Sequence, residues 1–110
     1  MTFEEAIEKA RSIRKTYEVL ERKKFGKEWE RKDLVLGFVH DVGDFVKTTM
    51  IMDGTREANP DSKYMLSHEL SDCLWSIIIL ADKYDIDLKE SFEENMNSME
   101  QRLIEEKSGE

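Results

Sequence analysis

Two pairs of carboxylate residues lie within otherwise apolar stretches of the chain. Glu69 and Asp72 belong to "HELSDCLWSIIILADKY", and Asp41 and Asp44 belong to "HDVGDFVKTTM". A spacing of three residues places both members of a pair on one side of a helix. A carboxylate among core residues costs several kcal/mol of free energy unless something compensates its charge. We therefore expect these acids either to lie at a hydrated edge of the fold or to hold a cation.

The donor type limits which cation such a site would hold. Four carboxylates packed face to face would repel one another unless a divalent cation lay between them. Oxygen-only ligands suit Mg²⁺, with Mn²⁺ as a substitute, and argue against zinc. In a chain with 25 acidic residues, however, two such pairs also arise by chance. The alternative interpretation is a helical bundle with acidic edges and no metal.

Three further residues border these acids. His40 and His68 each directly precede an acid, and adjacent residues point to different sides of a helix. We therefore expect neither histidine to join its neighbouring acid in one site. Gly43 costs about 1 kcal/mol of helix stability relative to alanine. We interpret Gly43 as allowing a neighbouring helix or a ligand to approach closely.

The bulk properties of the sequence exclude several classes of protein. A chain of 110 residues fits one domain, and its net charge of −8 argues against a nucleic acid polymer as the ligand. The single cysteine, Cys73, excludes an intramolecular disulfide framework and suits a reducing compartment. The N-terminus lacks the apolar region of a signal peptide, and no apolar run approaches the ~20 residues of a membrane span. We expect a cytoplasmic protein with no membrane segment.

Apolar periodicity predicts helices throughout, which indicates an all-α, four-helix bundle-like single domain over residues 1–110. The predicted helices run from Thr2 to Gly26, from about residue 34 to 52, from about 64 to 83, and from Asp87 to about 104. The first and the last helix begin with the spacing of a capping box. Residues 53–63 have loop composition. The polar tail, residues 105–110, is expected to fray.

The apolar faces of these helices predict the core and the assembly. The second helix should bury Val35, Phe38, Val39, Val42, Phe45, Val46, Thr49 and Met50, and the last helix should bury Leu88, Phe92, Met96, Met99 and Leu103. The third helix is apolar nearly all round, and such a helix needs burial on every side. Three companion helices can hardly supply that burial. We therefore expect a homo-oligomer.

The order of these motifs resembles that of the MazG-like group of all-α nucleoside triphosphate pyrophosphohydrolases. That family carries an ExxD pair, then a tryptophan in an apolar run, then "IDL" at the start of the last helix. The corresponding residues here are Glu69 to Asp72, Trp75, and Ile86 to Leu88. The family's EExxE motif maps onto residues 40–44, "HDVGD", where a histidine and two shorter aspartates replace the glutamates. The resemblance covers about residues 34–103 and looks like a side branch with a DVGD core.

The resemblance implies an activity and a set of site residues. Members of the family hydrolyse nucleoside triphosphates between the α and β phosphates, and they assemble as dimers or tetramers. The Mg²⁺ ligands would be Asp41, Asp44, Glu69 and Asp72, and either Asp44 or Glu69 could position or deprotonate the attacking water. Lys47, Lys83 and Asn95 are the candidate substrate-binding residues. Trp29, Trp75 or the loop of residues 53–63 could line a pocket for the base.

Three hypotheses follow for the function. The first is a Mg²⁺-dependent nucleotide pyrophosphohydrolase that removes noncanonical nucleotides. The second is a relative that acts on another pyrophosphate-linked substrate, as phosphoribosyl-ATP pyrophosphatases do. The third is a non-catalytic helical module that keeps the scaffold and binds a partner protein, which the substitutions at residues 40–44 would favour.

Overall fold

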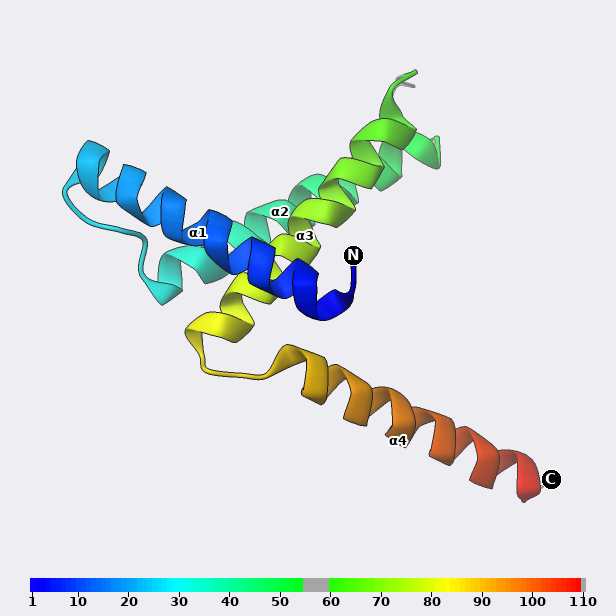
Figure 1. Ribbon diagram of the computed structural model, residues 1–110. Coiled ribbons are helices and arrows are strands. Elements are labelled where there is room, and N and C mark those ends of the chain that lie inside the picture. The colour runs from blue at the N-terminus through cyan, green and yellow to red at the C-terminus, as the bar shows by residue number, and fades with distance from the viewer. Residues whose placement is uncertain (55–59, 110) are drawn as a thin grey trace.

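The chain folds into helices joined by short connections (Figure 1). The computed structural model describes residues 1–54 and 60–109, and these residues contain no strand. The helices are α1 (Phe3–Phe25), α2 (Arg31–Met52), α3 (Ser62–Lys83) and α4 (Leu88–Ser108). The predicted all-α fold class is therefore confirmed. The part of the predicted loop that falls on residues 55–59 lies outside the described residues.

The helix ends follow the local capping chemistry. Thr2 and Glu5 form the predicted capping box of α1, and Gly26 ends this helix with a φ of 78°, in the left-handed region. Helix α2 begins three residues earlier than predicted. Asp33 lies inside its first turn, where its carboxylate accepts a 2.9 Å hydrogen bond from the backbone N–H of Glu30. At the other end of the chain α4 continues to Ser108, so residues 105–108 of the tail belong to this helix.

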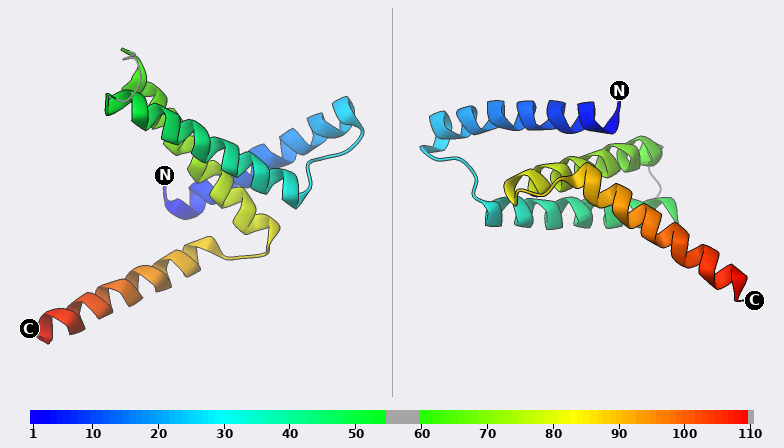
Figure 2. Two further views of the ribbon diagram at one scale, coloured as in Figure 1. Left: turned by 180° about the vertical axis from the view of Figure 1, so that it is seen from behind. Right: turned by 60° about the horizontal axis from the view of Figure 1, so that its bottom comes forward.

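Helix α3 is the central element of the fold. Helices α1 and α2 lie on opposite sides of it, and α2 runs antiparallel to α3 along most of its length (Figure 2). Helix α4 leaves the end of α3 and extends away from the other three helices, as both figures show. The main contact of α4 with α1 is an edge-to-face pair between Phe3 and Phe92, with ring centroids 6.2 Å apart.

The hydrophobic core of the isolated chain is small. Among the described residues, the buried apolar side chains are Ala10, Ile78, Ile79 and Ala81, with Phe3, Ile7, Leu34, Trp75 and Leu88 packed against them. The radius of gyration is 18.0 Å. A compact domain of this length would have about 13 Å. The chain therefore leaves much of its apolar surface uncovered.

The predicted core faces of α2 and α4 are largely exposed, which corrects the sequence prediction. Val35, Val39, Val42 and Val46 form a stripe along α2 and are 38–61% exposed, while Phe92, Met96, Met99 and Leu103 on α4 are 38–58% exposed. The physical reason is that α2 packs on α3 along one side only, and α4 has almost no neighbour within the chain. Periodicity identified the apolar faces of α2 and α4 correctly, but it did not identify which elements cover those faces.

None of the helices combines the length and the hydropathy that a membrane crossing requires, within the part of the chain searched.

Candidate active site

Two hydrogen bonds between side chains join α2 to α3 and bring the carboxylate pairs together. The Ser76 hydroxyl donates to Oδ2 of Asp41 over 2.9 Å, and the Thr48 hydroxyl donates to Oε1 of Glu69 over 2.8 Å. Because the helices are antiparallel, these two bonds fix one register. In that register the segment with Asp41 and Asp44 lies beside the segment with Glu69 and Asp72. The structure thus assembles the two predicted pairs along one helix–helix seam.

Glu69 has an atom that the protein leaves unsatisfied. Its Oε1 accepts from Thr48, which is 1% exposed, whereas its Oε2 is buried and has no hydrogen-bond partner among the described residues. A buried carboxylate oxygen without a partner costs free energy that a cation can recover. This atom is therefore a candidate ligand for a cation.

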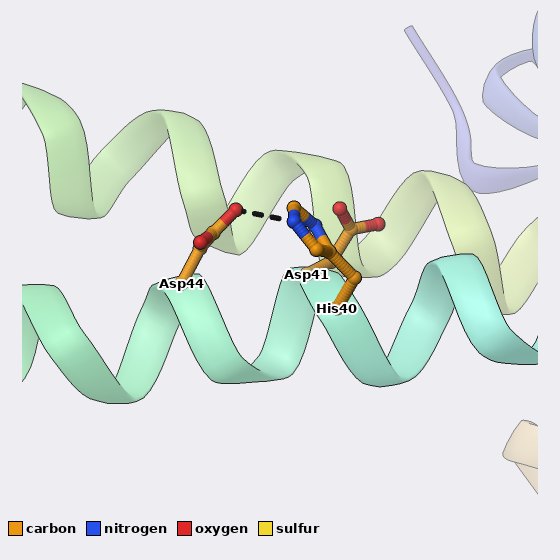
Figure 3. A group of neighbouring side chains, drawn as sticks. All are labelled: His40, Asp41 and Asp44. Atoms are coloured by element: carbon orange, nitrogen blue, oxygen red, sulfur yellow. Dashed lines mark ion pairs between the residues drawn. The ribbon is translucent and has the colours of Figure 1, made fainter.

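On α2, His40 lies with Asp41 and Asp44 in one cluster (Figure 3). One ring nitrogen of His40 and one carboxylate oxygen of each aspartate all lie within 4.8 Å of one another. His40 Nδ1 is 3.4 Å from Oδ2 of Asp44. The expectation that His40 would not join Asp41 is therefore wrong. Spacing describes Cβ directions, but donor atoms several bonds from the backbone can still converge across one turn.

On α3, His68 and Asp72 repeat part of this arrangement. His68 Nε2 is 3.6 Å from Oδ2 of Asp72, with the same i, i+4 spacing as His40 and Asp44. His68 is not part of a three-residue donor cluster among the residues searched. The two histidines therefore differ in surroundings although each pairs with one candidate ligand.

The pKa of the Cys73 thiol is affected by the negative charges along the seam between α2 and α3. Burial raises the pKa of Cys73 above its ordinary value of 9.0, and the negative charges of Asp41, Asp72 and Glu69 raise this pKa further. Acids from both helices thus act electrostatically on one thiol. This agrees with the close approach of the two pairs that the hydrogen bonds establish.

A cleft of about 990 Å³ opens beside the carboxylates. Its lining includes Asp41, Asp72, His40 and Ser76 together with the aromatic side chains of Trp29, Trp75 and Phe25. Small-molecule sites commonly measure roughly 300–1,000 Å³ and combine apolar walls with a few polar groups. The cleft has the size and lining of a ligand site that includes one acid from each pair, Asp41 and Asp72.

Trp29 is held in the cleft wall by close packing and by the backbone. A Cβ placed on Gly37 would lie 3.3 Å from Cζ3 of Trp29, so the absent side chain lets the indole approach α2. Gly43 has nothing within 4 Å of such a Cβ. A close approach therefore occurs at Gly37, for which none was predicted, whereas at Gly43, where one was expected, the described residues leave open space.

A buried arginine supports the segment that carries Trp29. Arg14, 7% exposed, donates through Nη1 and Nη2 to the two carboxylate oxygens of Glu21 over 2.9 and 2.7 Å. Glu21 also accepts a 2.9 Å hydrogen bond from the backbone N–H of Trp29. Because both oxygens of Glu21 are engaged, the end of the connector between α1 and α2, at Trp29, has a defined position.

The three predicted substrate-binding residues differ in their placement. Lys47 is exposed on α2, one turn beyond Asp44. Lys83 forms an ion pair with Glu18 of α1 and lies about 21 Å along α3 from Glu69, at about 1.5 Å per residue. Asn95 is exposed on α4, the helix that extends away from the seam. Within the described chain, only Lys47 is next to the carboxylates.

Several contributors to the site were not predicted from the sequence. Thr48 and Ser76 each lie four residues after a candidate ligand on the same helix, a spacing that could have suggested them. Arg14 is a charged residue of α1 and is nevertheless buried. No local signal marks it.

The family model of the MazG nucleotide pyrophosphohydrolase domain matches residues 1–104 of the 110-residue chain. No curated protein matches the chain.

Proposed function

Because the chain belongs to the MazG nucleotide pyrophosphohydrolase family, we propose that it hydrolyses nucleoside triphosphates between the α and β phosphates, giving a monophosphate and pyrophosphate. The reaction depends on Mg²⁺, with Mn²⁺ able to substitute, and removes noncanonical nucleotides. The observation that carries this proposal is the seam of carboxylates in which Glu69 Oε2 is buried without a partner, beside an aromatic cleft.

The metal would be held by Asp41, Asp44, Glu69 and Asp72. When bound, it supplies positive charge that neutralises the phosphate oxygens. Ser76 and Thr48 hold Asp41 and Glu69 in place through their hydroxyl groups. Such partners behind a ligand orient it.

Asp44 or Glu69 orients the attacking water and accepts its proton. The oxygen of that water forms a bond to the α phosphorus, and the bond from this phosphorus to the bridging oxygen breaks to release pyrophosphate. Asp44 is 51% exposed at its side chain and is therefore accessible to water. Glu69 has one free carboxylate oxygen.

The cleft accounts for binding of the nucleoside. Trp29 and Trp75 present aromatic surface on which a base can stack, and Asp41 and Asp72 line the same cleft, where the phosphates would reach the metal. Lys47 is placed to contact a phosphate oxygen. Lys83 and Asn95 remain candidate substrate-binding residues that would need a rearrangement or a second subunit to reach the same site.

We further propose a homo-oligomer, a dimer or a tetramer. Support comes from the exposed apolar stripe of α2, the exposed stripe of α4 and the extended shape of the chain. Apolar surface of this extent is usually covered in a soluble assembly. Sedimentation analysis tests this: Val39→Glu should shift the protein towards monomer, whereas Lys9→Glu, a substitution on the exposed side of α1, should not.

The decisive experiment measures pyrophosphate and monophosphate release from a panel of ribo- and deoxyribonucleoside triphosphates, with Mg²⁺ and with chelator. Asp72→Asn should abolish turnover, whereas Glu4→Gln, which removes an exposed acid elsewhere, should not. Metal-dependent release of both products would establish the reaction. No release from folded protein that also fails to bind Mg²⁺ would contradict the proposal and favour the non-catalytic helical module. Release from phosphoribosyl-ATP alone would assign the other substrate class.

A further inference from the structure

The cluster on α2 contains a nitrogen donor in addition to its carboxylates. We propose that His40 is a ligand of the metal site and shifts its selectivity from Mg²⁺ towards divalent transition metals such as Mn²⁺ and Co²⁺. This inference rests on the metal site of the proposed function but not on turnover. It concerns which ion the site prefers. A site made of carboxylates alone would have a different preference.

The geometry of the cluster is the first support. A ring nitrogen of His40 and one oxygen each of Asp41 and Asp44 lie within 4.8 Å of one another, so a single ion can contact all three after small rotations of the side chains. The His40 side chain is 76% exposed and the Asp44 side chain 51% exposed. Neither is fixed by packing, so adjustment onto an ion requires no change in the core.

The position of His40 relative to α3 is the second support. His40 lines the cleft together with Asp41 and Asp72, so it faces the same space as an acid of the opposite helix. The imidazole and a carboxylate of the opposite helix therefore border one space.

The chemistry of the donors gives the direction of the effect. Mg²⁺ binds oxygen ligands and gains little from imidazole, whereas imidazole nitrogen suits later transition metals, whose affinity rises from Mn²⁺ towards Cu²⁺. Neutral imidazole also adds no negative charge. Replacing a carboxylate by His40 therefore weakens the attraction for Mg²⁺ more than for a metal that accepts nitrogen.

Nuclear magnetic resonance of the histidine rings tests ligation directly. The chain contains only two histidines, so His68→Gln leaves the His40 ring as the one remaining signal. Zn²⁺ serves as a diamagnetic probe. We expect a large shift of one His40 ring nitrogen when Zn²⁺ is added to H68Q, and loss of this shift in H68Q carrying Asp41→Asn and Asp44→Asn. An unshifted His40 ring in protein that calorimetry shows to be Zn²⁺-loaded would overturn the proposal.

Selectivity is tested by calorimetric titration of Co²⁺ and Mg²⁺ at one fixed pH. His40→Gln should lower Co²⁺ affinity by at least about tenfold, the lower end of what loss of an outer-shell partner costs, while Mg²⁺ affinity changes much less. His40→Glu should raise Mg²⁺ affinity relative to Co²⁺. His68→Gln is the matched control and should leave the Co²⁺ to Mg²⁺ ratio unchanged. An equal change for both ions in His40→Gln would contradict the proposal.

These measurements separate this inference from the proposed function. A shifted His40 ring in a protein that releases no pyrophosphate would leave the nitrogen ligand established and remove the activity. Turnover with an unshifted ring would retain the activity and remove His40 from the site.

Discussion

The hydroxyl of Ser76 on α3 donates a 2.9 Å hydrogen bond to Oδ2 of Asp41 on α2. Thr48 on α2 makes the reverse connection to Glu69 on α3, over 2.8 Å. Each helix thus holds one carboxylate of the other by a hydroxyl. The seam is organised by neutral donors, which can orient acids without cancelling the charge that attracts a cation.

Removing these hydroxyls should weaken metal binding. We expect Ser76→Ala and Thr48→Val each to lower Mn²⁺ affinity by roughly tenfold, measured by calorimetry. Thr48→Val should also lower the free energy of unfolding by about 1–3 kcal/mol, because Glu69 loses its donor in a buried position. Thr49→Val is the matched control, since the Thr49 hydroxyl bonds only to the backbone of Val46 in its own helix. Equal effects at residues 48 and 49 would contradict this assignment.

Arg14→Met should destabilise the chain strongly. It leaves Glu21, whose side chain is 13% exposed, without its cation, and it removes one of the two cations that pair with Glu18. Loss of one partner from a buried pair costs about 3–5 kcal/mol. Arg14→Lys should recover only part of the lost free energy of unfolding, because an ammonium group cannot reproduce the two parallel hydrogen bonds of the guanidinium.

The control for Arg14 is Arg11→Met, which removes a cation that is 40% exposed at its side chain. Pairs of this exposure contribute about 0–1 kcal/mol. Urea unfolding of both variants gives the comparison. A loss at Arg14 no larger than at Arg11 would show that the buried network contributes little.

Substitution by alanine should have opposite effects at the two glycines of α2, Gly37 and Gly43. Gly43→Ala meets open space and should stabilise the chain by roughly 0.5–1 kcal/mol through helix propensity. Gly37→Ala places a methyl group 3.3 Å from the Trp29 ring and should displace it, so nucleotide affinity should fall. Thermal unfolding measures the stability of both variants, and tryptophan fluorescence with bound nucleotide measures their nucleotide affinity. If Gly43→Ala weakens association of subunits, then Gly43 lies at a subunit contact.

Cys73 should react slowly with a thiol reagent. Because its pKa is raised above 9.0, less thiolate is present at pH 8 than in an unfolded chain. Asp41→Asn or Asp72→Asn removes a nearby negative charge and should speed alkylation, whereas Glu4→Gln should not. An unchanged rate in both aspartate variants would show that the acids do not act on the thiol.

The raised pKa of Cys73 also makes the free energy of unfolding depend on pH. Above pH 9.0 the unfolded chain releases the Cys73 proton before the folded chain does. The contribution of this group to stability is therefore full below pH 9.0 and is lost as the pH rises through the raised pKa of the folded state. Cys73→Ser removes this dependence, which alkaline unfolding curves can measure.

Local sequence chemistry predicted the elements of this fold well. Each helix end depends on residues within one turn, so the local pattern is sufficient to predict it. Examples are the cap at Thr2, the left-handed Gly26 and the cap at Asp87. The start of α2 was predicted three residues late, because Asp33 can cap either by preceding a helix or by reaching back to Glu30 from inside its first turn. Spacing does not distinguish these two roles.

Contacts between helices were much less predictable. Periodicity assigned Val39 to the core, but in this chain it is 61% exposed because α2 has one helical neighbour. The pairing of Asp41 with Ser76 joins residues 35 apart and depends on the register of two helices. Side-chain reach likewise brought His40 to Asp41 although their Cβ directions diverge. Candidate ligands were thus found from sequence, whereas their neighbours required the packed structure.

The antiparallel register of α2 and α3 also bears on the order in which the chain folds. Both hydroxyl–carboxylate bonds lie inside this hairpin, and neither needs α1 or α4. The hairpin is connected by a short loop, and such local pairings form early because little chain entropy is lost on closing them. Native-state hydrogen exchange should therefore show the amides of α4 opening at the lowest free energy and those at the centre of α3 at the highest. A cation binding to the early hairpin would then favour folding before the terminal helices dock.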